Sequence, residues 1–201
     1  MVRQGIAALI DREDDIHVVG ECGNGMEVFA EVEKAHPDVV VLDISMPGLN
    51  GLDVCRQILR KLKGIAVLVL TMHADQEYVV RALKSGASGY LLKEAAAEQL
   101  TQAVRAVACG ELFLGPGVSH NVLQRLREDT QEDPYTQLTA RERQVLQQIA
   151  EGKTSRQIAE NMGLSIKTID THRSHLMRKL GIHDQTTLIK YAIRRGIVQL
   201  H

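Results

Sequence analysis

The chain has 201 residues, of which 44% are apolar, and a formal net charge of −1 at pH 7. This length suffices for one domain of common size and a smaller second one, each with its own hydrophobic core. No run approaches the roughly eighteen apolar residues of a membrane-spanning helix, and the N-terminus lacks the features of a secretory signal. We therefore expect a soluble, cytoplasmic protein.

The cysteines and the charges narrow the class further. Cys22, Cys55 and Cys109 are odd in number and form no CxxC pair, which disfavours a disulfide framework or a zinc site and favours buried spectator thiols. Residues 1–137 hold 13 basic and 20 acidic groups, whereas residues 138–201 hold 11 basic and 5 acidic groups. An excess of cations attracts a phosphate backbone, although a solvated basic surface has the same composition.

Residues 1–110 alternate short aliphatic runs with segments of helical periodicity, as a parallel α/β sheet requires. Continuous aliphatic strands imply that helices cover both faces of the sheet. The predicted strands are residues 17–21, 39–42, 66–70 and 89–92, and the predicted helices are 26–35, 52–62, 77–85 and 96–108. A Gly-Asn-Gly segment at 23–25 resembles a phosphate-binding loop but is more often a plain turn.

Residues 111–137 read as a linker between two domains, because they contain Gly115-Pro116-Gly117, a short helical patch at 122–126 and a polar run at 128–134. From residue 138 to 201 the pattern is helical throughout. Capping boxes at Thr139-Ala140-Arg141-Glu142 and Thr154-Ser155-Arg156-Gln157 mark two helix starts, and Ser165 caps a third helix. We expect a compact bundle of four helices.

Residues 157–169 have the spacing of a helix-turn-helix, with Gly163 at the turn, so the next helix is the candidate DNA-reading element. Its periodicity divides it into two faces. Ile169, His172, Leu176 and Leu180 form the inward stripe, and Lys167, Asp170, Thr171, Ser174 and Arg178 form the outward one. With no neighbouring ligand set, we interpret His172, His175 and His183 as packed, hydrogen-bonded histidines and not as metal ligands.

The motifs at 138–146 and 167–180 make residues 138–201 resemble a LuxR-type helix-turn-helix domain. A sigma-factor region shares the Leu-Thr-x-Arg-Glu-Arg start, but the preceding α/β domain argues against it. Asp170 departs from members with a cation there, and its carboxylate could repel phosphate or accept from a cytosine amino group. By resemblance, the DNA contacts are Lys167, Thr168, Thr171, Ser174 and Lys179, and the dimer contact is the final helix, 186–195, with Thr186, Ile189, Lys190 and Ile193.

Three polar side chains follow successive predicted strands of the first domain. Asp43, Thr71 and Lys93 each lie where a strand ends, and parallel strands place those ends at one edge of the sheet. This set suits phosphoryl transfer to the carboxylate of Asp43, with the hydroxyl and the ammonium binding phosphoryl oxygens. Each residue alone has a plain solvation role, so the prediction depends on all three together.

This constellation resembles the receiver domain of two-component response regulators, and with the C-terminal domain it resembles the NarL-type family over nearly the whole chain. The resemblance implies a flavodoxin-like parallel sheet with Asp43 as phosphoacceptor, Thr71 and Tyr90 as the switch pair, and Lys93 in contact with the phosphoryl group. It implies Mg²⁺ bound by Asp43 and the Ser45 carbonyl. The implied partners are a sensor histidine kinase and duplex DNA, bound as a homodimer, with RNA polymerase as a further possible partner.

One feature of the receiver pattern is absent. Receivers open with a strand that ends in two acidic Mg²⁺ ligands, whereas this chain opens with residues that resemble the helix after that strand. Asp14 and Asp15 follow this helix, at the opposite end of the sheet. We therefore expect an internal methionine taken as the start, or a truncated chain. Asp43 and Ser45 alone are then too few ligands for Mg²⁺.

The sequence thus predicts a non-enzymatic transcription regulator in which phosphorylated Asp43 draws Thr71 and Tyr90 inward and frees the reading helix. One alternative is a phosphate-independent DNA-binding regulator whose receiver serves only for docking or dimerisation. Another is an aspartyl-phosphate enzyme for small molecules, although no second catalytic carboxylate is evident near Asp43.

Overall fold

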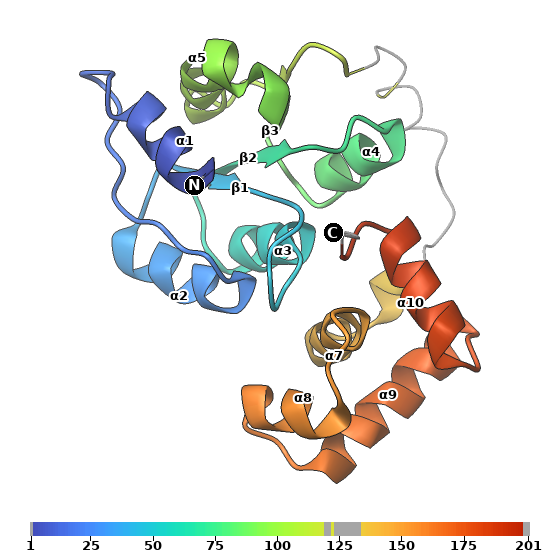
Figure 1. Ribbon diagram of the computed structural model, residues 1–201. Helices are drawn as coiled ribbons and strands as arrows, with labels where there is room; N and C mark the ends of the chain where they lie inside the picture. Colours follow the sequence, from blue (N-terminus) through green and yellow to red (C-terminus); the bar gives the residue numbers. More distant parts are fainter. Residues whose placement is uncertain (1, 119–121, 123–133, 199–201) are drawn as a thin grey trace. The chain divides into compact units, whose positions relative to one another are not determined.

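The protein is described by a computed structural model that covers residues 2–118, 122 and 134–198 (Figure 1). The described residues form two compact units, one α/β and one helical, and each is described by itself. Much of the predicted linker, including residues 123–126 of the helical patch and 128–133 of the polar run, lies outside the described residues. None of the helices in the described ranges is long and apolar enough to cross a membrane.

The first unit is built on a parallel sheet with the strand order β1-β2-β3-β4. Three of the four predicted strands are confirmed. The one predicted at 66–70 runs one residue further, through Thr71. The strands are β1 (Val39–Leu42), β2 (Ala66–Thr71), β3 (Gly89–Leu92) and β4 (Phe113–Leu114). The sequence did not predict β4, because two residues are too few to show an alternating pattern.

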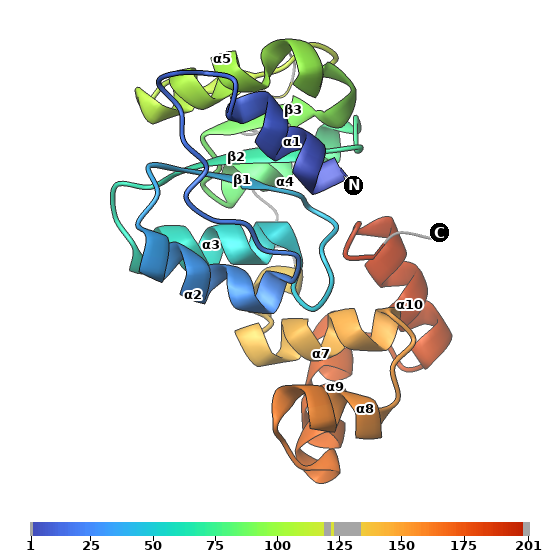
Figure 2. The same ribbon diagram turned by 60° about the vertical axis from the view of Figure 1, so that its left-hand side comes forward.

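Helices cover both faces of this sheet, as the aliphatic strands predict. In Figures 1 and 2, α1 and α5 lie on one face, and α2 and α3 lie on the other, where they pack against each other. Asn24 caps α2, because its Oδ1 accepts a hydrogen bond from the Met26 N–H (3.0 Å), so the Gly-Asn-Gly segment is a helix start. The helices are α1 (Val2–Ile10), α2 (Gly25–Ala35), α3 (Gly51–Lys61), α4 (Gln76–Lys84) and α5 (Ala96–Ala108), which follows the short turn η1 (Lys93–Ala95).

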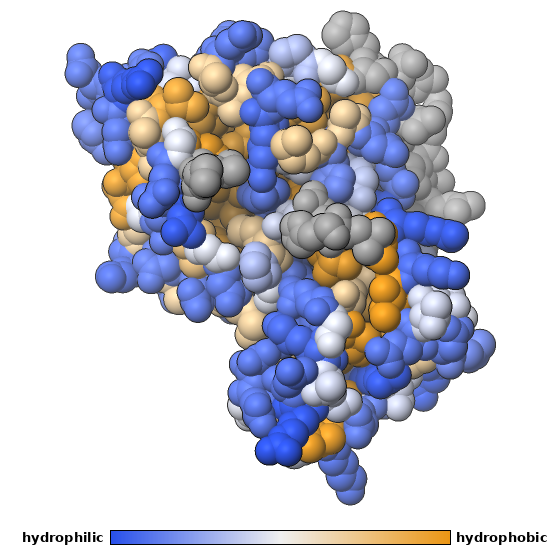
Figure 3. Space-filling model, in the orientation of Figure 1, coloured by the Kyte–Doolittle hydropathy of each residue, from blue (hydrophilic) through white to orange (hydrophobic). Residues whose placement is uncertain are grey.

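The strand predicted at 17–21 is wrong, because this segment forms no regular element. Ile16 and Val18 are half-buried and pack against the core, but Val19 is 61% exposed. A strand needs a neighbour for its backbone groups, and among the described residues β1 pairs only with β2. No described strand therefore lies beside this segment. On the same side of the sheet, Figure 3 shows apolar side chains over α1 and the adjoining side of β1.

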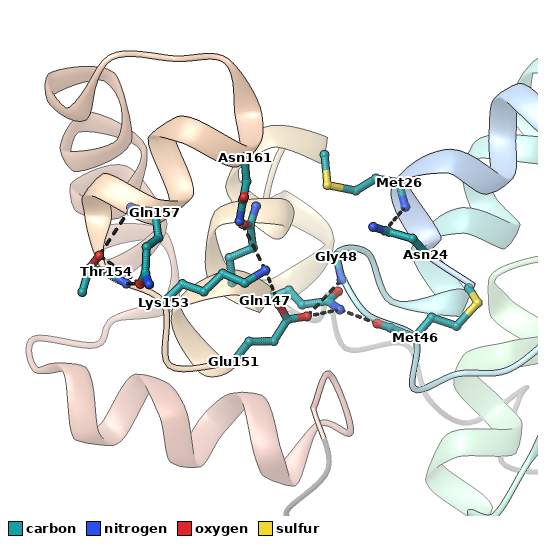
Figure 4. A network of polar contacts seen from close by, with 11 residues as sticks. Asn24, Met26, Met46, Gly48, Gln147, Glu151, Lys153, Thr154, Gln157 and Asn161 are labelled. Atoms are coloured by element: carbon teal, nitrogen blue, oxygen red, sulfur yellow. Dashed lines mark hydrogen bonds and ion pairs between the residues drawn. The ribbon is translucent and has the colours of Figure 1, made fainter. Parts of the chain in front are cut away.

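The second unit is the predicted four-helix bundle, preceded by the turn η2 (Pro134–Gln137). Both predicted capping boxes are present, and Figure 4 shows the one between Thr154 and Gln157. Gly163 and Gly181 end two helices in the left-handed conformation that glycine adopts readily. The helices are α7 (Ala140–Ala150), α8 (Ser155–Met162), α9 (Ile166–Leu180) and α10 (Gln185–Arg194), around a core that includes Ile158, Ile169, Leu176 and Leu188.

A buried ion pair joins α7 to α9. Glu142 is only 3% exposed, and its Oε2 accepts from the Lys179 Nζ and from the Thr139 N–H, both at 2.7 Å. The same ammonium donates to the Gln137 carbonyl at 3.2 Å. Burial raises the pKa of Glu142, but the hydrogen bonds from Lys179 and Thr139 lower it by more, so the folded-state pKa lies below the usual value.

This ion pair predicts how acid affects the second unit. Because the folded-state pKa of Glu142 is depressed, its stabilisation is complete above the unfolded-state pKa and is lost as the pH falls through the folded-state pKa. We expect Glu142→Gln to lower the free energy of unfolding at pH 7 by about 1–3 kcal/mol, because Lys179 loses its charged partner. The substitution should also flatten the loss of stability below about pH 5.

Urea unfolding followed by circular dichroism at several pH values measures both effects. The matched control is Glu160→Gln, which removes an exposed ion pair with Arg156 and should change the free energy by less than about 0.5 kcal/mol. An equal effect of the two substitutions would contradict a stabilising role for the buried pair.

Candidate functional site

The carboxyl edge of the sheet brings together the polar residues that the sequence singled out. Asp43 follows β1, Thr71 ends β2 and Lys93 follows β3, and all three strands run parallel. The Lys93 Nζ lies 2.6 Å from Asp43 Oδ2, with side chains 21% and 30% exposed. The carboxylate is therefore paired with a cation and is still partly exposed to solvent.

A glycine fixes the turn that carries this carboxylate. A Cβ on Gly51 would lie 2.0 Å from the Asp43 carbonyl oxygen, so only glycine fits at the start of α3. The Gly51 N–H donates to the Ile44 carbonyl at 2.9 Å. The backbone at the start of α3 thus lies against the backbone that follows β1, and this contact holds Asp43 at the edge of the sheet.

Thr71 and Tyr90, the predicted switch pair, are both bound to the backbone of His73. Buried Thr71 accepts through Oγ1 from the His73 N–H (3.3 Å), and the Tyr90 hydroxyl donates to the His73 carbonyl (2.7 Å). Burial raises the pKa of Tyr90, so the hydroxyl keeps its proton. Both side chains are fully buried in this conformation.

Sequence reasoning missed His73, which lies two residues after the end of β2. Its ring stacks on Tyr78 with the ring centroids 4.1 Å apart. Burial lowers the pKa of its imidazole, and Lys93 lowers it further, while Asp43 and Asp75 act in the opposite direction. The ring is therefore mainly neutral at pH 7 and adds no positive charge beside Asp43. Its place just beyond a strand end was the available signal.

The residues near Asp43 do not suit Mg²⁺, which takes about six oxygen ligands in strict octahedral geometry. In the part of the chain that the structure describes, no three His, Cys, Asp or Glu residues group around a possible ion. Ser45, two residues after Asp43, adds no carboxylate. Asp15 is held by Arg105, whose guanidinium nitrogens lie 2.6 and 2.9 Å from its carboxylate oxygens, near the C-terminal end of α5.

The two predicted faces of α9 are present in the second unit. Ile169 and Leu176 are fully buried, whereas Lys167, Asp170, Thr171, Ser174 and Arg178 are all exposed. Thr168 is half-buried, and its hydroxyl lies 2.8 Å from that of Ser165. The exposed residues form one polar stripe along the helix, which we call the reading stripe.

The remaining predicted residues of this unit, which are Lys179, the three histidines and the α10 residues, lie outside the reading stripe. The ammonium of Lys179 is bound to Glu142 and Gln137, inside the unit. His172 is half-buried as interpreted, but His175 and His183 are exposed, so the packed interpretation is wrong for these two. On α10, Thr186 and Lys190 are exposed, and Ile189 and Ile193 are half-buried, next to the core residues Leu188 and Ala192.

Comparisons with known proteins find a matching family for each of the two units. The family "Response regulator receiver domain" matches residues 1–105, and the family "Bacterial regulatory proteins, luxR family" matches residues 136–192. The transcriptional regulatory protein LiaR of Bacillus subtilis (strain 168) is 38% identical over 199 residues, which cover 98% of this chain and 94% of LiaR. DegU of Brevibacillus brevis, also a transcriptional regulatory protein, is 36% identical over 216 residues, which cover 100% of this chain and 92% of DegU.

A solved structure of two RcsB dimers bound to two parallel DNAs is similar along nearly the whole chain. It has a TM-score of 0.54 and 27% sequence identity, and the match covers 94% of this chain and 91% of that chain. Together with the parallel sheet and the helix-turn-helix, these matches show that the chain belongs to the two-component response regulators with a receiver domain and a LuxR-type DNA-binding domain.

Proposed function

We propose that this response regulator binds duplex DNA in the cytoplasm through the reading stripe of α9 and thereby controls transcription. The observation that supports this most is the division of α9, whose inner face is locked into the core by Ile169 and Leu176 while the reading stripe is exposed. A helix held in this way can enter a major groove without losing its contacts in the core.

The contacts that we assign follow from the exposure of each side chain. At the start of α9, Lys167 binds a DNA phosphate and Thr168 approaches the DNA backbone. Further along the helix, Thr171 and Ser174 face base edges. Lys179 acts as a positioning residue, because its ammonium holds α7 against α9 through Glu142. Removal of this ammonium should therefore weaken DNA binding indirectly, because α9 is then held less firmly against α7.

Substitution of the exposed lysine tests the phosphate contact. We expect Lys167→Ala to weaken binding to all duplexes alike and to reduce the slope of log K against log salt by about one, since one phosphate contact releases about one counterion. Fluorescence anisotropy over a series of salt concentrations measures the slope. Lys63→Ala, at an exposed position of the other unit, is the control and should leave the slope unchanged.

We further propose that Asp43 accepts a phosphoryl group from a sensor histidine kinase. A carboxylate oxygen attacks phosphorus, the bond from phosphorus to the donor's histidine nitrogen breaks, and an acyl phosphate forms. Lys93, at 2.6 Å from the carboxylate, neutralises charge on the transferred oxygens. Thr71 can donate its hydroxyl proton to one of these oxygens, because its Oγ1 only accepts from the His73 N–H. We propose no catalytic turnover on small molecules.

Intact-mass measurement tests this transfer. With acetyl phosphate as donor, we expect a slow gain of one phosphoryl mass per chain, which Asp43→Asn abolishes and which a chelator of Mg²⁺ changes little, because few metal ligands surround Asp43. Acceleration by Mg²⁺ would show that the site binds the ion despite this ligand set.

The scarcity of metal ligands also favours a second candidate, a regulator that binds DNA without phosphorylation and uses its receiver for docking or dimerisation. The two candidates differ in one measurement. If the mass does not change and the wild type binds DNA as tightly as Asp43→Asn, the second candidate holds; if acetyl phosphate raises the DNA affinity of the wild type alone, the first one holds.

We also propose that the chain binds DNA as a homodimer through the outer face of α10. Ile189 and Ile193 are half-buried one turn apart, with Lys190 exposed beside them, and apolar side chains at this spacing suit a helix-to-helix contact. With Ile193→Glu, the protein–DNA complex should contain one chain in place of two. Analytical ultracentrifugation measures the mass of the complex. Lys190→Glu is the control for charge alone and should preserve more of the dimer.

A further inference from the structure

We propose that Asp170 makes this regulator select, at the position it contacts, a base that exposes an amino group in the major groove, with cytosine as the preferred base. The proposal rests on the proposed function, because it requires that α9 reads DNA. Asp170 is exposed in the second turn of α9, with Lys167 three residues before it and Ser174 four residues after it. It is the only carboxylate on this helix.

The carboxylate of Asp170 is held in one orientation. Its Oδ1 accepts a hydrogen bond from the Ser155 Oγ at 3.0 Å. Ser155 is the first residue of α8, and the positive end of that helix stabilises a negative charge beside it. The second oxygen, Oδ2, accepts no hydrogen bond from the residues that the structure describes, so the fixed carboxylate still has an acceptor for a ligand.

The hydroxyls next to Asp170 also lack a donor for a ligand. The Thr171 Oγ1 donates to the Lys167 carbonyl, and the Ser174 Oγ donates to the Asp170 carbonyl, each at 2.9 Å. Their protons are directed at the helix backbone, which leaves oxygen lone pairs toward the outside. Between the cations Lys167 and Arg178, the reading stripe is therefore a row of acceptors.

A row of acceptors complements hydrogen-bond donors on the base edges. In the major groove these donors are the amino groups of cytosine and adenine, whereas guanine and thymine present acceptors there. Adenine also presents N7 beside its amino group, and two acceptors in proximity repel each other. Cytosine has no such acceptor of its own, so the carboxylate of Asp170 favours cytosine.

A selection from a pool of randomised duplexes tests the inference with the full chain. We expect the wild type to enrich cytosine at one position of each half-site, and Asp170→Ala to lose that preference while it keeps the others. Replacement of this C·G pair by T·A should weaken wild-type binding roughly 5- to 150-fold and Asp170→Ala binding less than about twofold. Removal of the carboxylate should also tighten binding to unrelated DNA.

Two further variants separate base reading from a structural role. Asp170→Asn keeps an oxygen for Ser155 and adds an amide donor, so the preferred base should change from cytosine to adenine, which pairs with an asparagine amide through N6 and N7. Glu160→Ala removes an equal charge from an exposed position of α8 and should leave every base preference unchanged. Thermal melting shows whether each variant is folded.

The possible outcomes are distinct. Identical base preferences of the wild type and both folded Asp170 variants would overturn the inference and leave the proposed function in place. Enrichment of adenine by the wild type would overturn the assignment of cytosine. If the wild type binds no duplex at all, the proposed function itself fails.

Discussion

The parallel pairing of β1, β2 and β3 is the constraint on which the receiver unit depends. Parallel strands end at the same edge of a sheet, so residues 43, 71 and 93 meet although they are far apart in sequence. Without this register Lys93 could not reach Asp43 at 2.6 Å. The same constraint makes Gly51 necessary, because the chain must turn back from β1 within a space that a Cβ would fill. The chemistry of the edge thus follows from the topology.

In the helical unit, the corresponding constraint is the attachment of α9 by its inner face. The core residues Ile169 and Leu176 and the ion pair between Lys179 and Glu142 hold this helix from different directions. The cation of this pair, Lys179, neutralises a buried carboxylate within the unit. Its loss would leave Glu142 charged and unpaired in the core, which is costly. The attachment of α9 to α7 therefore depends on Lys179, which the family resemblance also assigns to the DNA.

Sequence reasoning located the elements that have strong local signals. Capping boxes at Thr139 and Thr154 and the aliphatic runs of β1 to β3 depend on neighbouring residues, so they are legible without a structure. The failures have non-local causes. Residues 17–21 have a strand-like pattern but no described partner strand. The hydrogen-bond partners of Lys179 and Tyr90, 37 and 17 residues away in sequence, were likewise not visible in the local sequence. The convergence of Asp43 and Lys93 was predictable because topology, and not side-chain packing, decides it.

Both sites show that internal hydrogen bonds determine what remains available to a ligand. At the sheet edge, the Thr71 oxygen accepts from the His73 N–H, whereas the Tyr90 hydroxyl donates its proton to the His73 carbonyl. Thr71 therefore keeps a proton for a ligand and Tyr90 does not. The bond to His73 also links Thr71 to the segment before α4. On α9, the hydroxyls of Thr171 and Ser174 donate their protons to the helix backbone. From sequence alone each hydroxyl could donate or accept, but in this structure both can only accept from a ligand. The identity of a polar residue sets its range of partners, and the neighbouring backbone decides which of them it can still bind.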